Sequence, residues 1–451
     1  MHRILIVDDD VAVTNYLMVF LMQTERFETT VINDSREVPP LLTPDAFDVA
    51  ILDMDMPNVT GMDILRLMHE RGIQTPVIVL TGVSDVDLAV KAMKLAAFDY
   101  LTKPVDDDHL LQVIDSALEH RALHSSIEQL PPQLKREDLA HRAAFDRVPA
   151  QNPVMIRLLH QAEKMALGDL TIFLWGERGT GKEMLARAIH HASPRHDEPF
   201  VAVDAAAQDP AKFPADFFGQ ARVWSGAVEE RSGFLESAAG GTLYLGEVEY
   251  LTLPMQVRVK RALQTGEYYR ENSTQICKAT TRFIVTSSHD LTRDAYQDTF
   301  SRDLLYHLMV NSIRVPPLRD RKEDIPLLAE AFLERAMEKT GRRIAGFDPE
   351  YFEFLSRYDF PDNIQELRNI VEGSVVNAEG PRITVESLPQ FIRQKIATRG
   401  REVETTFRPR RLDDVVREYV ARTVEHCEGD RERAARELGV AVERVGEILG
   451  G

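Results

Sequence analysis

This sequence has little cysteine, no long apolar run and no excess of positive charge. Cys277 and Cys427 are its only cysteines, and they lie far apart without the spacing of metal ligands. The sequence therefore argues against a disulfide framework and a zinc site, and we expect a reducing, cytoplasmic location. No apolar stretch reaches about 18 residues, and the apolar run near Met1 is too short for a signal peptide, so we expect no membrane span.

The charge balance also limits the possible functions. A formal net charge of −18 excludes a global positive field that would attract nucleic acid, so any DNA binding must be local. Hydrophobic residues make up 44% of the 451 residues, which suits about two to four domains with real cores. The residue pattern predicts α/β domains at 1–120 and 146–395, a linker helix at 121–145, a polar linker at 396–411 and a small all-α domain at 412–451.

A glycine-rich stretch organises the second α/β segment. A β-prone run at 170–175 precedes it, and a helical pattern at 184–189 follows. A strand, a glycine loop, a lysine and a helix in this order predict a phosphate-binding loop, in which backbone N–H groups and the lysine surround phosphate oxygens. The alternative is a glycine-rich turn without a ligand. The predicted nucleotide-binding residues are Gly176, Glu177, Arg178, Gly179, Thr180, Gly181, Lys182 and Glu183.

In the first segment, short apolar strands predicted at 4–7, 49–52, 77–80 and 98–101 alternate with helical patterns. This alternation is typical of a doubly wound parallel sheet, which places its polar residues at the carboxyl ends of strands. Asp8, Asp9 and Asp53 stand at such ends and would repel one another without a cation, so we expect Mg²⁺ among them. The alternative is a set of solvated strand-end loops.

This segment resembles the receiver domain of response regulators, including the runs at 53–57 and Gly61. The resemblance implies a flavodoxin-like fold in which Asp8, Asp9 and Asp53 hold Mg²⁺. It also implies that Asp53 accepts a phosphoryl group from a sensor histidine kinase. The residues expected to contact the phosphate or relay its arrival are Thr81, Tyr100 and Lys103.

The segment at 146–395 resembles the AAA+ domain of NtrC-type activators of sigma-54 RNA polymerase. The match rests on the phosphate loop and on runs at 152–155, 199–201, 218–219, 240–243, 315–319 and 323–328. The resemblance implies a P-loop α/β domain with a helical lid, ATP as the ligand, and Glu247 as the candidate base that orients the attacking water.

Several functional positions of that family are changed here. They are, in chain order, a switch asparagine, the carboxylate that holds Mg²⁺, a sensor asparagine, both trans-acting arginines and the arginine of the second sensor motif. Since one arginine finger is worth about 10³–10⁵ in rate, we predict a domain that can bind ATP but hydrolyses it very slowly. The alternative is tolerated change in a working ATPase. The residues at these positions are Asp204, Gly246, Ser288, Ser301, His307 and Gln365.

The family's sigma-54 contact loop, Gly-Ala-Phe-Thr-Gly-Ala, is one residue shorter here. An aromatic residue and a hydroxyl survive at its tip, but a tight loop that presents its tip to a partner is sensitive to length. The change argues against engagement of sigma-54 RNA polymerase. The remnant consists of Val223, Trp224, Ser225, Gly226 and Ala227.

The C-terminal segment predicts helices at 412–424, 431–438 and 441–449, with a turn at Gly439. It resembles the Fis-type helix-turn-helix domain, which implies DNA binding through Arg433, Arg436 and Arg444. From Arg408 onward, however, nine arginines face ten acidic residues, so each monomer should bind DNA weakly. The alternative is a small dimerisation tail with no role in DNA binding.

Together these features predict a two-component response regulator of transcription that acts by binding DNA or protein. The expected partners are a sensor histidine kinase, DNA, and further copies in a dimer or hexamer, or a mixed oligomer with an active relative. Two alternatives stay open: an active, ATP-hydrolysing sigma-54-dependent activator, and a phosphorylation-controlled adaptor that does not bind DNA.

Overall fold

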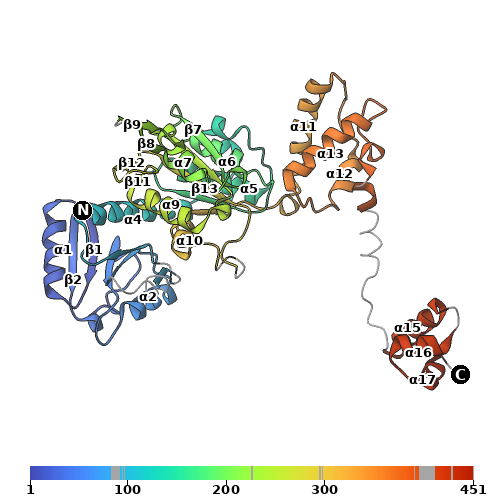
Figure 1. The fold of residues 1–451 in the computed structure, drawn as a ribbon, viewed down its shortest axis with the longest axis horizontal. Coiled ribbons are helices and arrows are strands. Elements are labelled where there is room, and N and C mark those ends of the chain that lie inside the picture. The colour runs from blue at the N-terminus through green and yellow to red at the C-terminus, as the bar shows by residue number, and fades with distance from the viewer. Residues whose placement is uncertain are drawn as a thin grey trace. The chain divides into compact units, whose positions relative to one another are not determined.

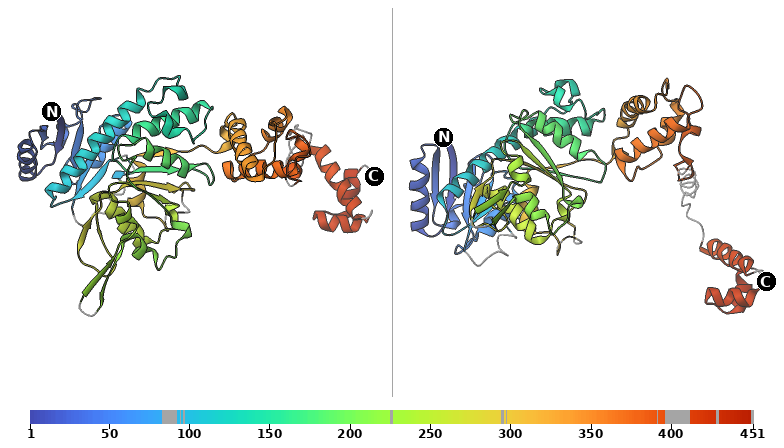
Figure 2. Two further views of the ribbon diagram at one scale, coloured as in Figure 1. Left: turned by 90° about the horizontal axis from the view of Figure 1, so that it is seen from above. Right: turned by 45° about the horizontal axis from the view of Figure 1, so that its top comes forward.

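The computed structural model describes residues 1–82, 92–93, 95, 97–224, 227–293, 296, 298–390, 392–395, 412–427 and 430–449. Contacts divide the chain into two compact units, Met1–Ser387 and Leu388–Gly451. Figures 1 and 2 show the first unit from blue to orange and the C-terminal helices in red. The predicted linker at 396–411 lies outside the described residues. Within the described ranges, no helix is both long and apolar enough to cross a membrane.

The first α/β segment is a parallel sheet in the order β2-β1-β3-β4-β5. Its central strands are buried along their length, which explains their continuous apolar runs. Every strand of this sheet except β2 was predicted from the sequence; most residues of β2 are only partly buried. The strands are β1 (His2–Val7), β2 (Phe27–Ile32), β3 (Val49–Asp53), β4 (Val77–Thr81) and β5 (Asp99–Thr102).

Helices α1 (Val11–Gln23), α2 (Gly61–Glu70) and α4 (Asp107–Glu128) belong to this segment. Asp10 caps α1 by accepting a hydrogen bond from the backbone N–H of Ala12. Helix α4 continues without a break past residue 120, where the sequence pattern placed the end of the first domain. The domain boundaries as such stay predictions.

The second α/β segment is also a parallel sheet, in the order β14-β6-β13-β10-β7. Apolar side chains cover both of its faces in two separate clusters. The strands are β6 (Ile172–Trp175), β7 (Phe200–Asp204), β10 (Thr242–Gly246), β13 (Arg282–Ser287) and β14 (Ser312–Arg314). Its helices are α5 (Pro153–Ala166), α6 (Lys182–His191), α7 (Phe213–Phe218), α8 (Phe234–Ser237), α9 (Leu253–Thr265) and α10 (Arg302–Met309).

Two antiparallel hairpins extend from this sheet, and a helical lid follows it. The hairpins pair β8 (Gln220–Trp224) with β9 (Ala227–Arg231), and β11 (Glu267–Tyr269) with β12 (Ile276–Lys278). The lid contains α11 (Asp324–Thr340), α12 (Pro349–Leu355) and α13 (Asn363–Asn377), drawn in orange in Figure 1. Short 3₁₀ turns are η1 (Ser35–Glu37), η2 (Arg136–Asp138), η3 (Arg142–Phe145), η4 (Ala205–Ala207), η5 (Val248–Tyr250), η7 (Leu318–Asp320) and η8 (Val385–Ser387).

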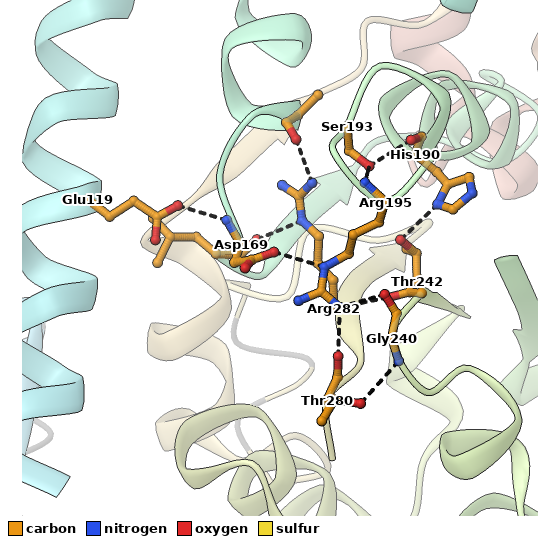
Figure 3. Close-up of polar contacts among 12 residues, drawn as sticks. Glu119, Asp169, His190, Ser193, Arg195, Gly240, Thr242, Thr280 and Arg282 are labelled. Carbon is orange, nitrogen blue, oxygen red and sulfur yellow. Dashed lines mark hydrogen bonds and ion pairs between the residues drawn. The ribbon is translucent and has the colours of Figure 1, made fainter. Parts of the chain in front are cut away.

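A cluster of polar contacts lies at the amino ends of these strands, opposite the end that carries the phosphate loop (Figure 3). The Arg195 guanidinium donates to the carbonyl oxygens of Gly240 at 3.0 Å and Thr280 at 2.6 Å, and its Nε donates to Asp169 at 2.9 Å. The backbone N–H of Asp169 in turn donates to Glu119 of α4 at 2.8 Å. This network satisfies backbone carbonyls and fixes α4 against the second sheet, which is a structural role.

The second unit is a small bundle of α15 (Leu412–His426), α16 (Arg431–Leu438) and α17 (Val442–Leu449). Val420, Ala435 and Val445 form its buried centre. Gly439 ends α16 with a left-handed φ of 65°, the conformation that glycine adopts readily. The helices agree with those predicted from the sequence, to within two residues at their ends.

Candidate functional site

Three carboxylates gather where β1 and β3 end. One oxygen from each of Asp8, Asp9 and Asp53 lies within 4.8 Å of the others. Asp8 is 1% exposed, Asp53 is 4% exposed, and burial raises the pKa of Asp8. Lys103 Nζ lies 2.6 Å from Asp8 and 2.5 Å from Asp53, so one ammonium group faces three acidic groups. Oxygen donors with this excess of negative charge fit Mg²⁺.

The other predicted receiver residues stand on the two neighbouring strands. Thr81 ends β4, is buried, and accepts a hydrogen bond from the Lys103 backbone N–H at 2.8 Å. Tyr100 lies on β5 and points away from the acidic group. Its hydroxyl donates to Asp303 of α10 at 3.2 Å and accepts from Lys260 of α9 at 3.0 Å. The structure therefore gathers the acidic residues and Lys103, but turns Tyr100 toward the second α/β domain.

The predicted phosphate loop connects β6 to α6. Lys182 is the first residue of α6 and only 6% exposed, and burial lowers its pKa. Its ammonium group donates to the carbonyl oxygen of Gly176 at 2.7 Å and to the Ser288 hydroxyl at 2.9 Å. Gly179 has a left-handed φ of 74°, and a Cβ there would lie 2.2 Å from the carbonyl oxygen of Asp362. Glycine is thus required where the lid meets the loop.

The lid contacts this loop through Asn363, the first residue of α13. Its side-chain amide donates to the carbonyl oxygen of Arg178 at 2.8 Å, and its Oδ1 accepts from the Leu318 N–H at 2.7 Å. Glu177 forms an ion pair with Arg319 at 2.5 Å, which holds the pKa of Glu177 below its usual value. These contacts close the lid onto the loop.

The carboxyl end of β10 lies beside Lys182. The Ser288 hydroxyl, which accepts from Lys182, donates to Glu247 at 2.7 Å. Glu247 has a left-handed φ of 53°, a strained conformation that is common at functional sites. Gly246 precedes it without a side chain, and a Cβ at that position would lie 3.1 Å from a ring carbon of Tyr244.

A cavity of about 640 Å³ spans the loop, the ends of β7 and β10, and the lid. The predicted residues that line it include Gly179, Gly181, Lys182, Glu183, Asp204, Gly246, Glu247 and Gln365. Asp204 ends β7 and accepts a hydrogen bond from the Ala206 N–H at 3.0 Å. The structure therefore brings together residues that lie far apart in the sequence, as a nucleotide site requires.

Comparisons with known proteins cover nearly the whole chain. Family models for a response regulator receiver domain, a sigma-54 interaction domain and an AAA+ ATPase lid domain match residues 4–115, 148–314 and 319–405. The regulatory protein AtoC of Escherichia coli (strain K12) is 34% identical over 446 residues, which are 98% of this chain and 95% of AtoC. The chain belongs to the NtrC family of response regulators.

Two more members of the NtrC family show similarity over their full length. The response regulator PilR of Pseudomonas aeruginosa is 32% identical over 97% of this chain and 96% of PilR. A crystal structure of NtrX from Brucella abortus in complex with ATP is 26% identical, covers 99% of this chain and 98% of that chain, and has a TM-score of 0.51. The expected family and fold class are confirmed.

This NtrC-family protein is thus a two-component response regulator with a sigma-54 activation domain. A receiver domain implies a sensor kinase as partner. Receiver domains generally use Mg²⁺, and AAA+ domains generally use ATP with Mg²⁺. The receiver acids of this chain fit Mg²⁺, whereas Gly246 gives the AAA+ site no carboxylate at the family's metal position.

Helix α10, which carries the trans-acting arginines in the NtrC family, contacts the receiver here. Ser301 caps the helix by accepting from the Leu304 N–H at 3.4 Å. His307 lines a cavity together with Asp99 of β5 and Gln264 of α9. Burial lowers the pKa of His307, so its imidazole is neutral near pH 7 and cannot supply the charge of an arginine.

The described residues of the predicted sigma-54 loop remnant belong to the β8–β9 hairpin. Val223 and Trp224 belong to β8, Ala227 begins β9, and Trp224 pairs with Ala227. Ser225 and Gly226 lie outside the described residues.

The arginines expected to contact DNA are exposed on α16 and α17. Arg433 lies 3.6 Å from Glu437, Arg444 lies 2.7 Å from Glu447, and Arg436 donates to the carbonyl oxygen of Glu432 at 3.4 Å. Local acidic partners thus offset the charge of two of the three arginines, in line with the net charge of the segment.

Among the residues not predicted from the sequence are Tyr244 beside Gly246, and Lys260 and Asp303 at the contact of Tyr100. Tyr244 could have been found, because side chains two apart in a strand share one face, which places it beside position 246. Lys260 and Asp303 had no local signal, since their partner Tyr100 lies more than 150 residues away in the sequence.

Proposed function

We propose that this regulator accepts a phosphoryl group on Asp53 and has an AAA+ domain that binds nucleotide without appreciable hydrolysis. It would then act on transcription through DNA or protein binding. The observation that carries the proposal is the end of β10, where Gly246 offers no metal ligand and Tyr244 lies beside it.

The receiver chemistry follows from the acidic group. Asp8, Asp9 and Asp53 would hold Mg²⁺, whose charge would offset that of the incoming phosphoryl oxygens. Asp53 is buried and lies 2.5 Å from Lys103, whose charge would stabilise a phosphoryl group transferred to this carboxylate. The Lys103 ammonium group and the Thr81 hydroxyl would then contact the new phosphate oxygens.

The contacts of Tyr100 offer a path for the signal. Tyr100 shares β5 with Asp99, and Gln264 Nε2 of α9 donates to Asp99 Oδ1 at 2.9 Å. Lys260 joins both sides of the contact, because it donates to Tyr100 at 3.0 Å and lies 3.4 Å from Asp303. If Tyr100 moved after phosphorylation, its hydrogen bonds with Lys260 of α9 and Asp303 of α10 would break.

The loss of ATP hydrolysis follows from charged groups of the family that are missing at three positions. Gly246 supplies no anionic oxygen for Mg²⁺, His307 is neutral, and Gln365 replaces the arginine of the second sensor motif. One arginine finger alone contributes about 10³–10⁵ in rate. The lid contacts of Asn363 and the position of Lys182 support retained nucleotide binding, and the similar NtrX was crystallised with ATP.

The test measures ATP binding and phosphate release together on the full chain, with and without a small phosphoryl donor. We expect ATP to bind and turnover to stay unchanged by phosphorylation, with Asp53→Asn as the control that the donor no longer phosphorylates. Turnover stimulated by the donor would contradict the proposal.

An active sigma-54-dependent activator is the second candidate. The observation in its favour is the intact chain from Lys182 through Ser288 to Glu247, with bonds of 2.9 and 2.7 Å. Whole-length similarity to AtoC and PilR supports it too. Donor-stimulated turnover, together with open-complex formation by sigma-54 RNA polymerase, would establish this function.

Whether the protein binds DNA or acts as a protein adaptor depends on the C-terminal bundle. Its net charge and the local acidic partners of Arg433 and Arg444 favour weak binding per monomer, which oligomers on adjacent sites would strengthen. A gel shift at low salt with promoter fragments separates the two functions. DNA binding is supported if the protein retards the fragments and the substitutions Arg436→Ala and Arg433→Ala reduce this retardation. The adaptor function is supported if the fragments are not retarded.

A further inference from the structure

At the position of the family's metal ligand, Gly246 has no side chain, and a neutral aromatic ring lies beside it. A Cβ at position 246 would lie 3.1 Å from a ring carbon of Tyr244 and 3.4 Å from its hydroxyl oxygen. That hydroxyl forms a 3.1 Å hydrogen bond with the Thr286 side chain, and burial raises the pKa of Tyr244. The phenol therefore stays protonated and offers Mg²⁺ no charge.

Cationic side chains of the protein line the same cavity. Besides Lys182, the cavity is lined by Arg147 before α5, Arg335 of α11 and Arg368 of α13. Across the part of the chain that the structure describes, none of these three guanidinium groups forms a hydrogen bond or ion pair. In a protein with net charge −18, three unpaired arginines around one cavity form a local positive site.

Arg368 lies near the place of the lost sensor arginine. It follows Gln365 by three residues on α13, so both side chains project from the same side of the helix and both line the cavity. Glu183 and Arg187 pair with each other at 2.7 Å. Asp204 and Glu247 are thus the remaining carboxylates that line the cavity, against Lys182 and the three arginines.

We propose that the AAA+ domain binds its nucleotide as the metal-free polyphosphate, with Arg368, Arg335 and Arg147 supplying the charge that Mg²⁺ supplies in the family. This inference rests on the proposed nucleotide binding. Bound Mg²⁺ neutralises part of the polyphosphate charge and finds no carboxylate at position 246. Mg²⁺ bound to the polyphosphate therefore weakens ATP binding here instead of promoting it.

The test is calorimetric titration of the full chain with ATP, once in EDTA and once in excess Mg²⁺. We expect affinity about tenfold higher in EDTA, the size of one charge-assisted contact. Higher affinity in Mg²⁺ would overturn this inference and leave nucleotide binding intact. No binding under either condition would instead refute nucleotide binding itself.

Variants locate the effect in this cavity. Arg368→Gln and Arg335→Gln should each weaken ATP binding in EDTA about tenfold and reduce the difference between the two conditions. Arg343→Gln is the matched control, because Arg343 is an exposed lid arginine that does not line the cavity. Lys182→Ala should abolish binding in both buffers. Affinity unchanged in Arg368→Gln and Arg335→Gln would overturn the inference.

Discussion

The ring of Tyr244 lies against Gly246 so closely that any side chain at position 246 would press on it, with 3.1 Å between the added Cβ and a ring carbon. Both residues belong to β10, and the Tyr244 hydroxyl is fixed by Thr286. The missing metal carboxylate and the aromatic ring therefore lie in direct contact on one strand. A carboxylate introduced at position 246 would press on this ring, so Gly246→Asp alone should restore a metal site less well than the same change combined with Tyr244→Leu.

The first prediction concerns this pair. Gly246→Ala should destabilise the protein by about 1 kcal/mol through overpacking, and Tyr244→Leu should relieve that cost, giving a favourable coupling in a double-mutant cycle. Chemical denaturation of the four proteins measures it. Additive effects of the two substitutions would show that the ring does not occupy the space of the missing side chain.

The same pair controls the response to metal. Gly246→Asp combined with Tyr244→Leu should make ATP binding stronger in Mg²⁺ than in EDTA, because an anionic oxygen then has room beside the phosphates. Gly246→Asp alone should gain less. Turnover should stay low in both variants, since Ser301, His307 and Gln365 are unchanged.

The second prediction concerns the receiver acids. Burial raises the pKa of Asp8, so its ionised form destabilises the fold at neutral pH, and this cost disappears as pH falls and Asp8 is protonated. Asp8→Asn should therefore raise the melting temperature in EDTA and abolish further stabilisation by Mg²⁺. The exposed Asp9 offers the contrast: Asp9→Asn should lose the Mg²⁺ effect without a gain in EDTA. Mg²⁺ stabilisation of Asp8→Asn would contradict Asp8 as a ligand.

The third prediction concerns pH. His120 of α4 forms a 2.9 Å hydrogen bond with Asn311 and packs on Phe98 and His124, and burial lowers its pKa to about 4. A lowered histidine pKa gives stability that is present above the unfolded value of about 6.5 and lost as pH falls toward 4. Between pH 6.5 and 4, the melting temperature of the unmodified protein should fall more steeply than that of the His120→Gln variant. Parallel pH profiles would contradict the prediction.

The fourth prediction concerns lid closure. Asn363→Ala removes the bonds to Arg178 and Leu318, leaves the buried N–H group of Leu318 unpaired, and places alanine at a φ of 51°. We expect a cost of about 2–4 kcal/mol in urea denaturation, together with weaker ATP binding. Asn369→Ala, an exposed change on the same helix, is the control. An unchanged denaturation midpoint in Asn363→Ala would contradict a closed lid.

The sequence by itself determined the features that depend on short segments. Apolar runs with polar ends gave the strands that carry Asp8 and Asp53, and glycine spacing identified the loop that ends at Lys182. Gly439 marked the turn between the last two helices. Strand β2 was missed because it is only partly buried and lacks a continuous apolar run.

Only the tertiary structure decided how the departures from the family combine. Ser301 became a helix cap, His307 came to lie in a cavity beside Asp99, and unpaired Arg368 came to line the cavity that contains Lys182. Helical periodicity and turn chemistry act over a few residues and can be recognised in the sequence. Contacts between residues far apart depend on how whole elements pack, and that packing sets which charges meet at the site.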